Sequence, residues 1–293
     1  MRITDAMNIN TVLQTESQSS QRLAQLEATA SSGVRVSQPS DDPAAFASIV
    51  QQTAQIATVQ GRSSAATTAA GDLDLAGSTL DQATTLLEQV RAIAVAQSSG
   101  TGDASSRSNA AAQVDSLRQQ LLALANTQGA SGYLFGGTAN GSPPFDSSGN
   151  FVGNSGVTHV EVASGVLAVS NANGAQAFTA AGGQDVFAAL QSLSTALTNN
   201  DTSGIQASIG TIDASHDQVV AAEVDTGELS DRLHSASNAI TTAVTQMQTA
   251  LSSTSDADIA QTVTNMQATQ TAYQAALQVN KQILSLASSV VGS

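Results

Sequence analysis

The hydrophobic residues near the C-terminus recur in alternating steps of three and four. This spacing predicts one long amphipathic helix from Asp256 to about Val291. Ser255 is the expected N-cap residue. Gln270 and Asn280 interrupt the apolar stripe, and they either fix the register of a helix pair or lie at its solvent-exposed edge. The helix cannot cover its own stripe, so it requires partner helices.

A second amphipathic helix is predicted near the N-terminus, from about Asp5 to Ala30. Its apolar positions share one register, with Glu16 and Ser19 as polar interruptions. Ser32 and Gly33 provide a plausible helix end. We expect the two terminal helices to pair with each other.

Further helical patterns fill most of the remaining chain. One begins at Asp42 and Pro43, an N-cap followed by a favourable first helical residue, and extends to Ala94. Its glycines leave open a bend, a break or a close helix contact; they are Gly61, Gly71 and Gly77. Other helices are expected at about 106–127, from Asp185, and at about 202–251, the last of them containing Gly227.

The composition changes between Gly129 and Gly183, where glycines and phenylalanines are concentrated. Phe145 and Phe151 flank a turn sequence that predicts a hairpin, and short strands are expected around residues 160–162 and 166–169. The predicted fold is therefore mainly α, a long antiparallel helical rod or coiled coil with a small inserted β-domain. Its expected parts are terminal helices (1–42 with 255–293), a rod (43–130 with 184–254) and a β-rich insert (131–183).

Composition restricts the function classes. Charged residues make up only 11% of the chain and the net charge is −14, with Lys281 as the single lysine. Nucleic acid and anionic membranes are therefore unfavourable partners. The absence of cysteine excludes disulfides, and no apolar run is long enough to span a membrane. The N-terminus lacks a secretory signal core, so we expect a cytoplasmic protein or one exported without a cleaved signal.

The sequence offers no convincing catalytic, cofactor or metal site. The glycine-rich segment Gly132–Gly137 lacks the ending of a phosphate-binding loop and is better explained by turns around buried aromatic side chains. Asp41 and Asp42 are interpreted as helix-capping residues, whereas Asp72 and Asp74 are expected on a solvated face. The histidines are too dispersed to predict a ligand set; they are His159, His216 and His234.

The two terminal stripes carry most of the functional information. They either pack within a helical bundle of one molecule or become covered when copies assemble, and the low charge and the wide stripes favour assembly. The expected subunit-packing residues are Ile9, Val12, Leu23, Leu26, Ile259, Val263, Met266, Tyr273, Leu277 and Leu284. A secreted protein that acts alone, or an enzymatic or ligand-binding module in the insert, remains an alternative.

Several stretches resemble the bacterial flagellin family in the order expected for it. They are SSGVRVSQPSDDPAA (31–45), EQVRAIAVAQSSGTGD (88–103), LLALANTQGASGYLFGG (121–137), PF (144–145) and ALQVNKQILSL (276–286). Pro39 and Pro43, together with the YLFGG segment and the later PF pair, are most similar to members that join the hook to the filament. Flagellin itself is the nearest alternative.

The resemblance implies a structural protein without enzymatic activity. It implies export in an unfolded state through the flagellar type III apparatus, with a cytoplasmic chaperone holding the C-terminal region. Outside the cell, paired terminal helices form the inner tube of a hollow helical assembly, and the insert faces outwards. The implied partners are other copies of the chain, another hook-associated protein on the hook side and flagellin on the filament side.

Overall fold

The computed structural model describes residues 2–99 and 102–291. The chain forms two compact units, each considered by itself. Unit 1 comprises Met1–Ile56 and Thr245–Ser293, and unit 2 comprises Ala57–Val244. The mainly α fold predicted from the sequence is confirmed, whereas the predicted division into three parts stays a prediction.

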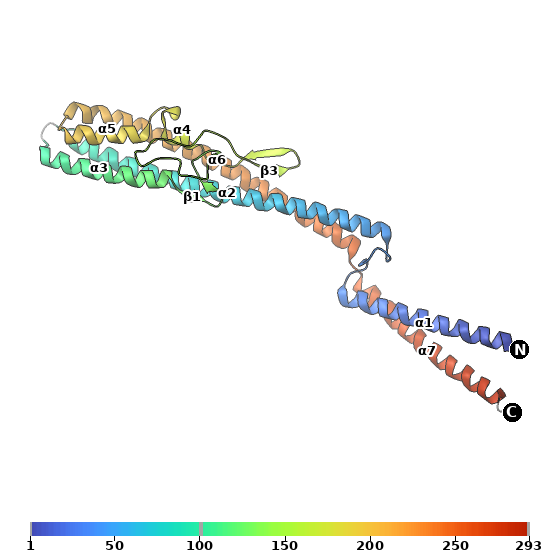
Figure 1. The fold of residues 1–293 in the computed structure, drawn as a ribbon. Helices are drawn as coiled ribbons and strands as arrows, with labels where there is room; N and C mark the ends of the chain where they lie inside the picture. The colour runs from blue at the N-terminus through green and yellow to red at the C-terminus, as the bar shows by residue number, and fades with distance from the viewer. Residues whose placement is uncertain (1, 100–101, 292–293) are drawn as a thin grey trace. The chain divides into compact units, whose positions relative to one another are not determined.

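Unit 1 contains the two terminal helices, which lie side by side (Figure 1). Helix α1 spans Arg2–Ser32 and helix α7 spans Ile259–Val291. The unit also includes the first turns of α2 (Pro43–Gln97) and the last turns of α6 (Thr202–Ser255). The pairing of the chain ends expected from their apolar stripes is therefore present within one molecule.

The predicted start of the C-terminal helix was wrong by three residues. Ser255 is the last residue of α6, and Asp256 forms an antiparallel β-bridge with Val34. That bridge interrupts the helical backbone at Asp256. Helix α7 begins only at Ile259, where the Asp258 carboxylate accepts a hydrogen bond from the backbone N–H of Gln261 at 3.0 Å.

The segment after α1 crosses the junction between α6 and α7, and we call residues 33–42 together with 254–258 the knuckle. Around the β-bridge, the backbone N–H of Arg35 donates to the Ser255 carbonyl at 2.7 Å, and that of Ala257 donates to the Gly33 carbonyl at 2.8 Å. Gly33 adopts a φ of 72°, which suits a glycine that ends a helix. Val36 is only 3% exposed, so this side chain of the knuckle is almost completely covered.

Unit 2 is built on two long helices. Helix α2 has 55 residues and α6 has 54, and both are continuous through their glycines. A Cβ added at Gly61, Gly71, Gly77 or Gly227 would meet no atom within 4 Å. These glycines therefore mark neither a break nor a close helix contact. Buried leucines on the inner face, such as Leu73 and Leu233, hold the helices in place despite the glycines.

Two shorter helices complete the helical part of unit 2. Helix α3 spans Ala104–Ala125 and packs against α5, which spans Val186–Thr198 (Figure 1). Buried Arg107 joins the turns at their ends, because its guanidinium donates to the carbonyls of Gln97 and Ser99 and to the side chain of Asn200.

The predicted β insert is present but contains only two small two-stranded sheets. Strands β1 (Gln128–Gly129) and β2 (Gly132–Tyr133) form one, and β3 (His159–Ala163) and β4 (Val166–Val169) form the other. The hairpin expected between Phe145 and Phe151 is present with a single β-bridge in place of paired strands, and within it the Asp146 N–H donates to the Asn150 carbonyl at 3.0 Å. A short helix, α4 (Gly174–Phe178), and a 3-10 turn (Ala180–Gly182) lead back to α5.

Aromatic packing and one amide fasten the insert to the helices. Phe178 makes edge-to-face contacts with Phe135 and Phe145, at ring-centroid distances of 5.3 and 5.7 Å. The Gln218 side chain on α6 donates to the carbonyls of Ala177, Thr179 and Gln184 at 3.0–3.1 Å, and it accepts from the Gln184 N–H at 2.7 Å. This fully used amide links α6 to the end of the insert.

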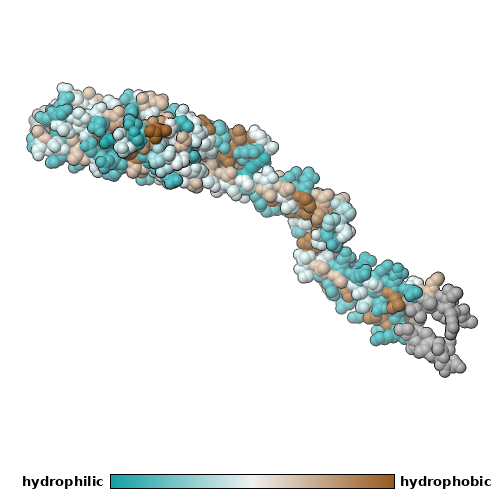
Figure 2. All heavy atoms as spheres, viewed as in Figure 1, coloured by the Kyte–Doolittle hydropathy of each residue, from teal (hydrophilic) through white to brown (hydrophobic). Residues whose placement is uncertain are grey.

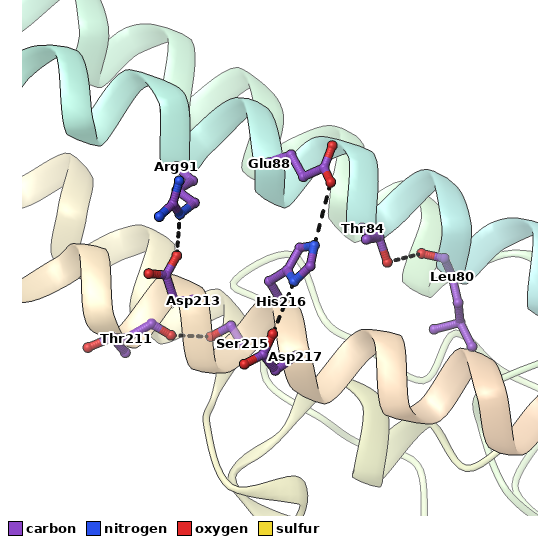
Figure 3. Close-up of polar contacts among 9 residues, drawn as sticks. All are labelled: Leu80, Thr84, Glu88, Arg91, Thr211, Asp213, Ser215, His216 and Asp217. Atoms are coloured by element: carbon purple, nitrogen blue, oxygen red, sulfur yellow. Dashed lines mark hydrogen bonds and ion pairs between the residues drawn. The ribbon is translucent and has the colours of Figure 1, made fainter.

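Polar side chains connect α2 and α6 (Figure 3). Arg91 pairs with Asp213, and His216 lies 3.7 Å from the Glu88 carboxylate and 3.4 Å from that of Asp217. These groups are partly or largely exposed, so they contribute little stability individually and serve mainly to align the two helices. His216 is therefore a contact residue between α2 and α6.

Candidate subunit-packing surface

The terminal stripes remain only partly covered when α1 and α7 pair. On α1 the half-buried stripe residues are Val12, Leu23 and Leu26, and on α7 they are Val263, Met266, Tyr273 and Leu277. Ile259 is 46% exposed. The side chains of Ile9 and Leu284 lie outside the described residues. One helix therefore covers only part of the other's stripe, and apolar area remains for further helices.

The polar interruptions of the two stripes differ in their environments. Asn280 is half-buried and donates to the Glu16 carboxylate at 3.1 Å, which joins one interruption on each helix. Gln270 is exposed. Of the two interpretations left open by the sequence, Asn280 fits the register-fixing one and Gln270 the solvent-edge one. A side-chain pair of this kind favours one alignment of two helices over shifted alternatives.

Arg35 and two aspartates organise the knuckle beside this helix pair. The Arg35 guanidinium donates to the Thr254 carbonyl at 2.9 Å and lies 3.5 Å from the Asp42 carboxylate. Asp42 caps α2 by accepting from the Ala45 N–H, and this bond, with a smaller contribution from Arg35, lowers the pKa of Asp42. The capping role predicted for Asp42 is confirmed.

Asp41 stabilises the turn rather than a helix. Its carboxylate accepts from the side chain of Gln38 and from the backbone N–H groups of Ser37 and Gln38, at 3.0–3.1 Å. These bonds, with that of the Gln38 side chain first, lower the pKa of Asp41. Sequence reasoning missed the contribution of Arg35, because its partners at Thr254 and Ser255 lie far away in the sequence.

A groove of about 490 Å³ lies between α1 and the knuckle. Arg22, Leu26 and Val34 line it together with Arg35 and Asp41. Its mixed apolar and charged walls resemble a protein contact more than an enclosed small-molecule pocket. It extends the partly covered stripe of α1 toward the knuckle.

In unit 2, the two aspartates of the acidic pair on α2 form hydrogen bonds with other segments. The expectation that Asp72 lies on a solvated face was wrong, because Asp72 is 9% exposed and accepts from the backbone N–H groups of Ala130 and Ser131. Asp74 is half-exposed and accepts from Ser230 and His234, with the Ser230 bond as the main cause of its lowered pKa. Within residues 2–99 and 102–291, no group of three or more His, Asp or Glu side chains is placed to hold a metal ion.

The surface does not present one continuous apolar face in the view of Figure 2, where hydrophobic residues lie singly or in small groups among hydrophilic ones. None of the helices in the described part of the chain is long and apolar enough to cross a bilayer. The apolar surface that remains on α1 and α7 is of a kind that other protein helices can cover.

Paired terminal helices around an inserted middle region define a class of helical proteins whose terminal stripes are suited to association. The N-terminal helical region of bacterial flagellin matches residues 3–140, and the C-terminal helical region matches residues 209–292. The chain belongs to the bacterial flagellin family. It is therefore a structural protein of the flagellum.

Solved structures share the fold. A putative flagellar hook-associated protein from Vibrio parahaemolyticus is 22% identical with a TM-score of 0.67, and the match covers 74% of this chain and 100% of that one. Hook-associated protein 3 from Legionella pneumophila is 16% identical with a TM-score of 0.58, over 71% and 98% of the two chains. FlgL from Xanthomonas campestris is 17% identical with a TM-score of 0.57, over 68% and 99%. No curated protein sequence matches this chain.

Proposed function

We propose that this chain joins the hook of the bacterial flagellum to its filament, as a structural subunit without catalytic activity. The observation that carries the proposal is the incomplete burial of the terminal stripes when α1 and α7 pair. Apolar surface that one molecule leaves in water is removed from water when copies pack, at about 25 cal/mol per Å². The packing residues are the ten stripe positions named above.

The member of the family is chosen by the extent of the structural likeness. The proteins described as hook-associated or junction proteins align over 98–100% of their own length with this chain. A flagellin that builds the filament is the alternative. We propose a limited number of copies at the junction, with a second hook-associated protein on one side and flagellin on the other.

The proposal also includes the route by which the chain leaves the cell. A chain without cysteine has no disulfide to hinder passage through a narrow channel in an unfolded state. We propose export through the flagellar type III apparatus without a cleaved signal, with a cytoplasmic chaperone covering the C-terminal stripe until then. The chaperone would protect the apolar residues of α7 that α1 leaves partly exposed.

A deletion strain tests the role at the junction. Cells that lack the protein should keep their hooks, lose their filaments and release flagellin into the medium, as seen by electron microscopy and by immunoblotting of the medium. Restoring the gene should restore filaments. If the protein were itself the filament subunit, the medium of the deletion strain would contain no separate flagellin. Antibodies against the protein would then label wild-type filaments along their whole length.

Hydrogen exchange of the dilute monomer tests the physical reason. We expect fast exchange in α1 and α7 and slow exchange in the buried parts of α2 and α6, because few apolar contacts protect the terminal pair. Assembled copies should exchange slowly in both regions. Slow exchange of the terminal helices in the monomer would contradict the idea that assembly is needed to cover them.

A further inference from the structure

The β3–β4 hairpin has two outer edges whose backbone groups follow from its ladder. The Ser170 N–H donates to the Thr158 carbonyl at 3.0 Å, which makes this a hydrogen-bonded pair. Pairs alternate along an antiparallel ladder, so the pair one step inward, Val169 with His159, is not hydrogen-bonded. The pair three steps inward, Leu167 with Glu161, is of the same kind. The N–H and C=O groups of Leu167 and Val169 therefore point away from β3.

The same alternation directs backbone groups of β3 away from β4. His159 lies opposite Val169, and Glu161 lies opposite Leu167, in pairs that do not exchange hydrogen bonds. Their N–H and C=O groups point away from β4. Glu161 also accepts from Arg62 on α2 through its side chain, at 3.0 Å, and this ion pair holds β3 in position.

The outer edge of β4 is apolar and open. Val166 is 52% exposed and Leu167 is 63% exposed. Within the described part of the chain, no other segment forms a hydrogen bond with the backbone of Leu167. Residues 157–169 contain no Lys, Arg or Pro, the residues that commonly protect an edge strand from pairing.

A groove continues this edge toward α6. It has a volume of about 140 Å³ and is lined by Val157 and Val169 from the insert and by Ala222 and Leu229 from α6. An extended segment that pairs with β4 could place apolar side chains there. An edge strand recognises another strand through its backbone and through alternate side chains, so both features point to a strand as the occupant.

We propose that the outer edge of β4 pairs with the outer edge of β3 in a neighbouring copy of this chain. The inference rests on the proposed function, which places identical copies side by side. Because β3 and β4 are antiparallel, a neighbour related by simple rotation brings its β3 antiparallel to β4, and its own β4 remains open for the next copy. This head-to-tail contact suits a ring or a helix.

Charge supports a second copy as the occupant. The chain carries a net charge of −14, so most surfaces of two copies repel each other. Between residues 157 and 169, Glu161 is the only acidic residue, and it is already paired with Arg62, while Asp225 on α6 lines the adjoining groove. The hairpin is thus a place where like copies meet with little of that repulsion, and a two-stranded hairpin gains support from a third strand.

The absence of cysteine allows a direct cross-linking test. Single variants His159→Cys and Leu167→Cys are expressed in a deletion strain, separately and together, and hook–filament structures are purified and treated with a short bis-maleimide. Ser116→Cys, at an exposed position on α3, is the matched control. We expect a cross-linked dimer only when both hairpin variants are present together.

Each result of the cross-linking experiment either supports or overturns the proposed pairing of β4 with β3. A dimer from Leu167→Cys alone would indicate that β4 pairs with β4 of another copy, and it would overturn the head-to-tail contact. Normal incorporation of all variants with no cross-link would overturn the inference and leave the proposed function intact. If even the wild-type chain were absent from purified hook–filament structures, the proposed function would fail, and this inference would fall with it.

Discussion

Replacement of Asp72 by alanine should destabilise unit 2, although the sequence places this residue on a polar face of a long helix. The carboxylate is 9% exposed and accepts hydrogen bonds from Ala130 at 2.7 Å and from Ser131 at 3.0 Å. A hydrogen bond to a charged group contributes about 1.5–3 kcal/mol, and some of this loss is recovered when water reaches the freed N–H groups. We expect a loss of about 2–4 kcal/mol for Asp72→Ala.

Asp74 provides the matched control, two residues further along α2. Its side chain is 54% exposed, so the loss for Asp74→Ala should stay below about 1 kcal/mol. For a unit of this size, 1 kcal/mol corresponds to about 2–4 °C in Tm, so Asp72→Ala should lower the Tm by about 4–16 °C. Asp72→Asn, which keeps one acceptor oxygen, should fall between the two alanine variants.

Thermal unfolding of the full chain, followed by circular dichroism, measures these differences. The transition of unit 2 is the one that persists when the terminal helices are removed by limited proteolysis. Equal and small shifts for Asp72→Ala and Asp74→Ala would refute the reasoning, since they would mean that the two N–H groups find water without cost. A large shift for both would point instead to a general effect of charge on α2.

Three further predictions concern the other contacts described above. Gln218→Leu should cost about 2–4 kcal/mol, because it leaves one N–H and three carbonyls without their partner, and chemical denaturation of the chain checks this. Leu277→Asp should leave unit 2 folded by circular dichroism but abolish incorporation into purified hook–filament structures, whereas the neighbouring exposed Gln278→Asp should be incorporated normally. The knuckle should loosen as the pH falls below about 4. The folded-state pKa values of Asp41 and Asp42 lie below the ordinary aspartate value, so the two carboxylates stabilise the knuckle above the ordinary value and lose this effect on acidification. Limited proteolysis at decreasing pH would detect the loosening as faster cleavage near Pro39.

The helices could be predicted from the sequence because their apolar positions repeat over many turns. The start of α7 could not, since the local capping preference of Ser255 was overridden by the bridge between Asp256 and Val34. The burial of Asp72 was missed for a similar reason: its hydrogen-bond partners come from a turn that follows 58 residues later.

The burial of the polar residues in the terminal stripes could not be predicted from the sequence either. Gln270 and Asn280 interrupt one stripe in the same way, and the sequence gives no reason to separate them. Only the position of Glu16 on the other helix does so, because it supplies a partner for Asn280. Periodicity therefore defines which face of a helix is apolar, but the partner decides which polar residue on that face is buried.

The free energy gained by burying the exposed apolar area of the terminal stripes favours assembly with several neighbours over simple dimerisation. Full burial of a large apolar side chain contributes about 1.5–3 kcal/mol, and a stripe residue that is already mostly covered gains at most about a third of this, roughly 0.5 kcal/mol. Seven stripe residues in the described part of α1 and α7 are partly buried in this way, which gives about 3–4 kcal/mol for each copy. Association costs an estimated 4–15 kcal/mol in lost freedom. A neighbour that covers only part of the stripes repays this cost poorly, whereas a copy enclosed on several sides gains the full amount, so copies should remain single until a template such as the hook end presents several neighbours at once.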